Sequence, residues 1–182
     1  METTRKLHPG QPFHPVTLSR LDGDTYTFGD AGSWEALFIY RGKHCPRCRE
    51  YLGKIQSHLE AFNSLGISVA AASGDSEIQA RVTMDAVKPT FPLLFGLPES
   101  EMHRLGLYVS APRSENETDH NFPEPALFVV NPDRELHIVD IANAPFVRPD
   151  LEALIDGIGF IMERRYPIRG TVRWDDARQL LR

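Results

Sequence analysis

Hydrophobic residues along this chain fall into short apolar runs that alternate with longer helical stripes. Three largely apolar runs, at 34–40, 67–72 and 126–130, predict buried strands. After the first run, apolar side chains recur every three or four residues from Cys48 to Phe62, which predicts an amphipathic helix. The regular alternation of strands with helices predicts an α/β fold built on a mixed central sheet.

The remaining apolar segments predict shorter elements and a last helix. They are hairpins at 16–18 with 25–28 and at 126–130 with 136–141, a strand at 91–95, and helices at 78–87, 99–105 and 149–161. The first hairpin turns at Asp22-Gly23, a strong turn signal, and predicts an N-terminal β-hairpin extension. The order of elements places helices on both faces of the sheet. A polar segment at 108–124 has no periodicity and is expected to be a functional or mobile loop.

Length and charge narrow the class of protein. With 182 residues, we expect one domain at 1–164 and a C-terminal tail at 165–182, which includes Trp174. The net charge of −5 argues against a nucleic-acid partner, because nucleic-acid-binding domains are usually basic. No apolar stretch approaches the roughly 20 residues that span a bilayer, and the polar N-terminus does not resemble a signal peptide. These features predict a cytoplasmic protein with no membrane partner.

The two cysteines, Cys45 and Cys48, form one Cys-x-x-Cys motif with three possible interpretations. Haem attachment requires a histidine after the second cysteine, and Arg49 stands there. A structural zinc site needs four ligands, and only His8 and His14 have a suitable spacing. Those two histidines precede the cysteines, and the segment between them contains two prolines, so the zinc interpretation is weaker. A redox dithiol is favoured.

The position of the motif predicts different roles for the two cysteines. Cys45 lies where a strand meets the N-terminus of a helix, and Pro46 is well suited to a first helical turn. Free backbone N–H groups at that terminus favour a thiolate, and four cations add to the effect: Arg41, Lys43, Arg47 and Arg49. Cys48 lies on the inward stripe, where it can close a disulfide with Cys45. The alternative is that Cys48 is only a small core residue.

These motifs resemble the thioredoxin-like superfamily. Within it, the chain is similar to the redoxin branch of alkyl hydroperoxide reductase and thiol-specific antioxidant proteins. More narrowly, it resembles a peroxiredoxin-like group whose active site reads Arg-Gly-x-x-Cys-Pro-x-Cys, here Arg41 to Cys48. The resemblance runs from about residue 10 to 171, and other segments follow in the family order: 21–23, 73–76, 125–129 and 145–146.

The sequence departs from that family at the residues expected to polarise a peroxide. A standard peroxiredoxin carries a proline and a hydroxyl residue where this chain has Phe38 and Gly42. In the family, the later strand carries an arginine that touches the thiolate. Here that strand begins Glu124-Pro125-Ala126, which resembles thioredoxin's cis-proline site, so we expect a cis bond at Pro125. The peroxide donors are then missing unless Arg41 or a loop arginine substitutes for them.

The resemblance implies a thiol oxidoreductase in which Cys45 attacks a disulfide or a peroxide and Cys48 resolves the product. We expect it to reduce disulfides and, slowly, peroxides, with Arg41, His44 and Pro125 positioning the substrate or stabilising the thiolate. An external thiol reductant of the thioredoxin or glutathione type restores the dithiol, without a metal or an organic cofactor. A redox-sensing or binding module with little turnover is the alternative, and a homodimer is left open.

Two further residues receive structural roles. We expect Asp75 to cap the helix at 78–87, because it follows the strand at 67–72. We expect Arg148 and Pro149 to open the last helix. The tail after residue 164 is expected either to wrap its own domain or to dock on a partner.

Overall fold

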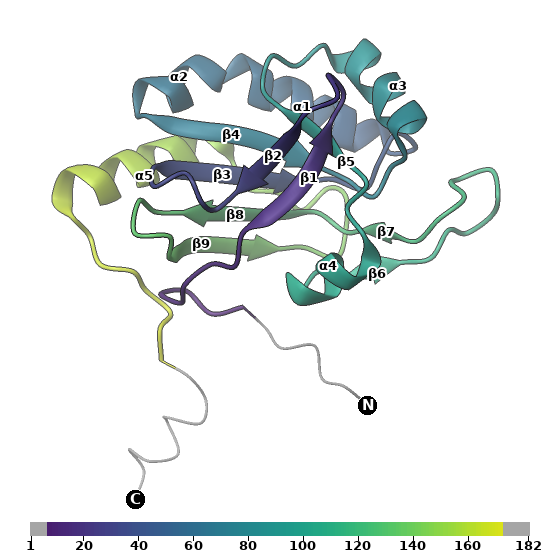
Figure 1. Cartoon of the computed structure of the whole chain (residues 1–182). Coiled ribbons are helices and arrows are strands. Elements are labelled where there is room, and N and C mark those ends of the chain that lie inside the picture. Colours follow the sequence, from purple (N-terminus) through teal and green to yellow (C-terminus); the bar gives the residue numbers. More distant parts are fainter. Residues whose placement is uncertain (1–6, 173–182) are drawn as a thin grey trace, which may run out of the picture.

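The computed structural model describes residues 7–172. A seven-stranded mixed sheet forms its centre (Figure 1). In spatial order the strands are β2 (Thr25–Phe28), β1 (Val16–Arg20), β5 (Leu93–Phe95), β4 (Ile67–Ala72), β3 (Trp34–Ile39), β8 (Ala126–Val130) and β9 (Leu136–Ile141). The three central strands β5, β4 and β3 are parallel, and the outer pairs are antiparallel. The predicted α/β fold with a mixed sheet is confirmed.

Helices cover both faces of the sheet, as the sequence predicts. One face packs against α1 (Pro46–Ser57), α2 (Leu59–Ser64) and α5 (Leu151–Arg164), with α3 (Glu77–Val87) beside α1 and β5. The other face packs against α4 (Glu99–Arg104) and the N-terminal segment. Side chains alternate along β3, so that Phe38 enters the first core and Leu37 the second.

The N-terminal hairpin belongs to the main sheet. Its strand β1 pairs with β2 on one side and with β5 on the other, so the sheet continues through the hairpin. A small second sheet lies inside the segment that the sequence predicts as a loop, with β6 (Val109–Ser110) paired to β7 (Phe122–Pro123). The 108–124 segment is therefore anchored at both ends.

Three helix boundaries differ from the expectation. The predicted stripe from Cys48 to Phe62 is divided at His58, whose backbone leaves the helical region at φ −102° and ψ 1°. The helix α3 is capped by Ser76 rather than by Asp75, because the Ser76 side chain accepts from the Gln79 N–H. The last helix starts at Leu151, with Asp150 accepting from the Ala153 N–H as its cap. Asp75 and Arg148 are thus free of the capping roles expected for them.

The described part of the C-terminal tail runs back toward the N-terminal segment. The backbone N–H of Tyr166 bonds to Ile161 at the end of α5, and Gly170 lies close to Pro9. Trp174 and the rest of 173–182 lie outside the described residues. Within residues 7–172, no helix has the length and apolar character needed to cross a membrane.

Candidate active site

The two cysteines form a disulfide at the N-terminus of α1. Cys45 is the residue that caps the helix, and its sulfur accepts a hydrogen bond from the Cys48 backbone N–H at 3.2 Å. The Cα atoms are 5.2 Å apart, an ordinary separation for a disulfide. Cys48 lies inward beside Leu52 and Ile55. Both cysteines are buried, Cys45 with 4% of the residue exposed and Cys48 with none, so Cys45 is slightly the more exposed residue.

A tight turn before Cys45 explains why no hydroxyl residue occupies position 42. Gly42 has φ +138°, a conformation that residues with a side chain rarely adopt. A Cβ atom there would stand 3.0 Å from the Asp75 carboxyl carbon. The turn is held by the Cys45 N–H on the Gly42 carbonyl at 3.1 Å and by the Lys43 N–H on Asp75 at 2.8 Å. The carboxylate of Asp75, which follows strand β4, therefore occupies the space that the family's hydroxyl side chain would need.

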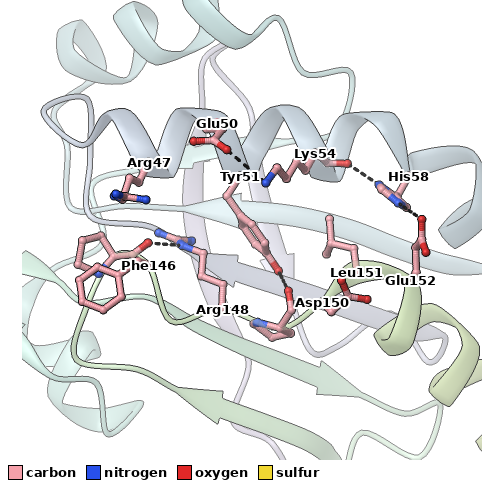
Figure 2. Close-up of a pocket in the computed structure, with 12 residues that line it drawn as sticks. Arg47, Glu50, Tyr51, Lys54, His58, Phe146, Arg148, Asp150, Leu151 and Glu152 are labelled. Atoms are coloured by element: carbon pink, nitrogen blue, oxygen red, sulfur yellow. Dashed lines mark hydrogen bonds and ion pairs between the residues drawn. The ribbon is translucent and has the colours of Figure 1, made fainter.

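Arg148, which lies in the loop between β9 and α5, contacts the dithiol. Its Nη2 atom donates to Cys48 Sγ at 3.0 Å, and its Nε atom donates to the Pro145 carbonyl at 3.0 Å. The guanidinium also lies 4.8 Å from the ring centre of Tyr51, whose hydroxyl donates to Pro149. Figure 2 shows the guanidinium held between α1 and the loop at 145–149. Burial lowers the pKa of Arg148 to about 10, which still leaves it charged at neutral pH.

Sequence reasoning missed Arg148 because it was expected to begin the last helix. The helix begins three residues later, so Arg148 remains in an irregular loop between Pro145 and Pro149. An arginine placed between two prolines is a signal that could have been noticed, because prolines keep the segment out of a helix. This loop also borders a groove with a cavity of about 450 Å³ (Figure 2), lined in part by Arg47 and Phe146.

Arg41 is directed to a buried carboxylate. Its Nη2 atom donates to Glu124 Oε1 at 2.9 Å, and its guanidinium lies 4.7 Å from the ring centre of Phe122. Glu124 is 3% exposed and accepts a second hydrogen bond from Ser110 at 2.6 Å. The observed contacts of Arg41 are therefore those of an ion pair that ties the start of α1 to the segment before β8.

His44 directly precedes Cys45, whereas Pro125 lines a small cavity with Tyr51 and Arg148. The His44 ring centre is 4.5 Å from that of Phe122, and both ring nitrogens are buried with no hydrogen-bond partner in the described chain. Burial lowers the pKa of His44. The expected cis bond at Pro125 is wrong: the described peptide bonds are all trans, and the Pro125 carbonyl accepts from the Ala142 N–H at 2.9 Å. This bond continues the antiparallel pairing of β8 with β9, which the trans backbone satisfies.

His8 and His14, the histidines with a zinc-type spacing, do not form a metal site with the cysteines within the described residues. His8 and His14 line a pocket with Phe13 and His103. Within residues 7–172, no three or more histidine, cysteine or acidic side chains gather in a way that could hold a metal ion.

A family model described as AhpC/TSA family matches residues 9–139, well over half of the chain. The chain belongs to the AhpC/TSA family. A curated relative, a 1-Cys peroxiredoxin of Medicago truncatula, is 24% identical over 115 residues, covering 58% of this chain and 50% of the relative. The chain thus spans about half the length of the curated relative that it matches.

Solved structures show that this AhpC/TSA chain has the peroxiredoxin fold. Peroxiredoxin 6 of Arenicola marina superposes with a TM-score of 0.72 at 16% identity, covering 96% of this chain and 89% of that one. AhpC of Mycobacterium tuberculosis gives 0.69 at 17% identity, covering 87% and 99%. A peroxiredoxin-like protein of Aquifex aeolicus gives 0.71 at 11% identity, covering 85% and 88%. The predicted thioredoxin-like, redoxin-type fold is confirmed.

Proposed function

We propose that this AhpC/TSA chain is a thiol oxidoreductase that uses the Cys45/Cys48 dithiol to reduce disulfides and, more slowly, peroxides. The observation that carries the proposal is a disulfide at a helix N-terminus with a half-buried arginine, Arg148, on its inner sulfur. The helix terminus and the guanidinium both favour thiolate forms of the two cysteines.

In disulfide exchange, the Cys45 thiolate attacks one sulfur of the substrate disulfide. A mixed disulfide forms, and the other substrate sulfur leaves as a thiolate that takes a proton from water. The Cys48 thiolate then attacks the Cys45 sulfur, which releases the second substrate thiol and closes the Cys45–Cys48 disulfide. An external dithiol of the thioredoxin type, or two thiols of the glutathione type, reduces that disulfide and is itself oxidised. Arg148 supports this sequence because it stabilises Cys48 as the resolving and leaving thiolate.

In peroxide reduction, the Cys45 thiolate attacks one peroxide oxygen and becomes a sulfenic acid, and the other oxygen leaves as hydroxide or an alkoxide, which takes a proton from water. The Cys48 thiolate then displaces hydroxide from that sulfenic acid, the hydroxide takes a proton from the solvent, and the same disulfide forms. We expect this reaction to be slow, because the hydroxyl donor of the family is replaced by Gly42. Losing one donor to the developing charge typically costs about 10²–10³ in rate.

A second assignment exchanges the two cysteines for the peroxide reaction alone. Arg148 is a loop arginine that touches a sulfur, but the sulfur that it touches is Cys48. If the guanidinium polarises the peroxide, then Cys48 forms the sulfenic acid and Cys45 resolves it. Cys45 remains the more exposed residue of the two and lies at the helix N-terminus, which supports its role toward disulfide substrates in either assignment.

Single-cysteine variants test the function and separate the two assignments. We expect Cys45→Ser to abolish insulin disulfide reduction, while Cys48→Ser gives one stoichiometric reaction and a trappable Cys45 adduct. After one equivalent of peroxide, dimedone should label Cys45 in the Cys48→Ser variant. Dimedone labelling of Cys48 in the Cys45→Ser variant at a higher rate would establish the second assignment. Peroxide-dependent and insulin-dependent turnover both absent from the unmodified chain would support the alternative of a sensing or binding module.

The proposed partners follow from this chemistry. The substrates are a protein disulfide or a peroxide, and the reductant is an external thiol system in the cytoplasm. Neither a metal nor an organic cofactor takes part in the proposed steps. A homodimer is compatible with them and is tested by the molecular mass in solution, measured by light scattering.

A further inference from the structure

A buried carboxylate lies directly beneath the turn that carries Cys45. Asp75 follows strand β4, and its side chain is fully buried. Its Oδ2 atom accepts the Lys43 backbone N–H at 2.8 Å, whereas Oδ1 has no hydrogen-bond partner within the described chain. An ionised carboxylate with a buried, unpaired oxygen costs several kcal/mol, so this group favours its protonated form unless a cation faces it. Burial accordingly raises the pKa of Asp75.

The unpaired oxygen faces a histidine from the 108–124 segment. His120 Nε2 is 3.8 Å from Asp75 Oδ1, and Nε2 is itself buried without a hydrogen-bond partner. The other ring nitrogen, Nδ1, is 2.8 Å from Asp119 Oδ1 and 3.1 Å from Thr118 Oγ1. Because a carboxylate accepts a proton donor, Asp119 fixes the hydrogen on Nδ1. The nitrogen that can exchange a proton with Asp75 is then Nε2.

One proton can reside on either of these two atoms, which lie within ion-pair range at 3.8 Å. It can lie on Asp75 and point to a neutral imidazole, or lie on His120 and pair a cation with the carboxylate. We propose that Asp75 and His120 hold this proton jointly at neutral pH, and that the pair is a positioning unit whose ionisation controls the reactivity of Cys45. The proposal rests on the proposed function only in taking Cys45 as the nucleophile.

The pair is connected to Cys45 through the backbone of the turn. Asp75 accepts the Lys43 N–H and abuts the α-carbon of Gly42, whose carbonyl accepts the Cys45 N–H. When the pair holds its proton, no net negative charge lies beneath the turn. When the proton is lost, a net charge of −1 opposes a thiolate at Cys45, since like charges disfavour each other. The thiolate and the pair should therefore titrate as coupled groups.

Other charged groups face the pair from the elements packed against it. The Lys43 side chain and the buried Tyr40 hydroxyl face Asp75, and burial raises the pKa of Tyr40, which keeps that hydroxyl neutral. Asp119 faces His120, with its pKa held low by the hydrogen bonds from His120 and Gln79. His44 lies near His120, and Glu117 lies near His44. These groups shift the titration of the pair. Replacing Asp75 or His120 one at a time separates the contribution of the pair from theirs.

A nuclear magnetic resonance titration of the intact oxidised chain tests the shared proton. We expect the Asp75 ¹³Cγ shift to change in two steps with pH, because the carboxyl group senses its own charge and that of the His120 ring, whose Nε2 atom lies 3.8 Å from Oδ1. In the His120→Gln variant, the Asp75 shift should move in a single step at a changed pH. An Asp75 titration that is unchanged in His120→Gln would overturn the shared proton. This measurement needs no catalytic turnover, so its failure is distinct from a failure of the proposed function.

Alkylation of the reduced chain tests the effect on Cys45. In a Cys48→Ser background, the iodoacetamide rate against pH should show two inflections, one from the thiol and one from the pair. The second inflection should disappear in both Asp75→Asn and His120→Gln. Asp85→Asn removes a carboxylate from the exposed face of α3 and should retain it. The same two inflections in all four proteins would refute the control of Cys45, and His120→Gln decides the question if Asp75→Asn does not fold.

Discussion

Arg148 and Cys48 are 100 residues apart in the chain, yet the guanidinium of the first donates to the sulfur of the second at 3.0 Å. The Pro145 carbonyl and the Tyr51 ring hold the guanidinium in that place. Arg41, by contrast, is neutralised by Glu124 at 2.9 Å. The cation observed on a sulfur therefore comes from the loop before α5, rather than from the residues that flank the motif.

Replacing Arg148 with Met should weaken the reactions that need a Cys48 thiolate. Without the cation, the reduced Cys48 thiol should ionise at higher pH, and, in the assignment in which Cys48 attacks the peroxide, peroxide turnover should fall by about 10²–10³. Stopped-flow peroxide kinetics and a thiolate absorbance titration measure the two effects. Arg47→Met is the matched control, because Arg47 is an exposed cation in the first turn of the same helix. Equal losses in both variants would show that the general positive charge acts, rather than the contact.

Restoring the family's hydroxyl with Gly42→Thr should destabilise the fold and leave the peroxide rate no higher. The new Cβ would meet the Asp75 carboxyl group, and the φ of +138° strains any side chain, at a cost of about 1–3 kcal/mol. Urea unfolding measures this loss. Gly53→Ala within α1 has open space around it and should instead stabilise by about 0.5–1 kcal/mol. A Gly42→Thr protein as stable as the unmodified chain would mean that the turn rearranges easily.

Breaking the pair between Arg41 and Glu124 should destabilise the protein more than removing both charges. Arg41→Met leaves a carboxylate that is 3% exposed without its cation, which costs about 3–5 kcal/mol. In the double variant Arg41→Met/Glu124→Gln, most of the lost stability should be regained. A double-mutant cycle of urea-unfolding free energies measures the coupling. Additive losses would show that the two side chains contribute separately.

His44 should make the stability of the protein depend on pH near neutrality. Burial lowers its pKa in the folded state, so the unfolded chain binds more protons between that lowered pKa and about 6.5. Stability contributed by the neutral ring is therefore present above about pH 6.5 and is lost as the pH falls through this window. The free energy of unfolding of His44→Gln, taken relative to that of the unmodified chain, should therefore be higher at pH 5 than at pH 8. Urea unfolding at both values checks this, and an identical difference at both would contradict it.

The local patterns in the sequence predicted most of the elements of this fold. Short continuous apolar runs identify β3 and β4, because strands at the centre of the sheet are buried on both faces. A stripe with a period near 3.6 identifies α1, because that helix buries one face. The spacing of Cys45 and Cys48 likewise predicts a dithiol at a helix N-terminus, which the disulfide occupies. The sequence does not predict the break at His58, and it places the start of α5 at Pro149 instead of Leu151, since helix ends depend on individual capping bonds.

By itself, the sequence determined most of the elements, the dithiol and the absence of a hydroxyl residue at Gly42, because each of these is a property of neighbouring residues. Only the tertiary structure decided what surrounds the dithiol. The sheet order brings Arg148 to Cys48, and Asp75 with His120 to the turn before Cys45. The physical reason is that contacts between distant segments depend on strand order and loop path, which no periodicity within one segment encodes.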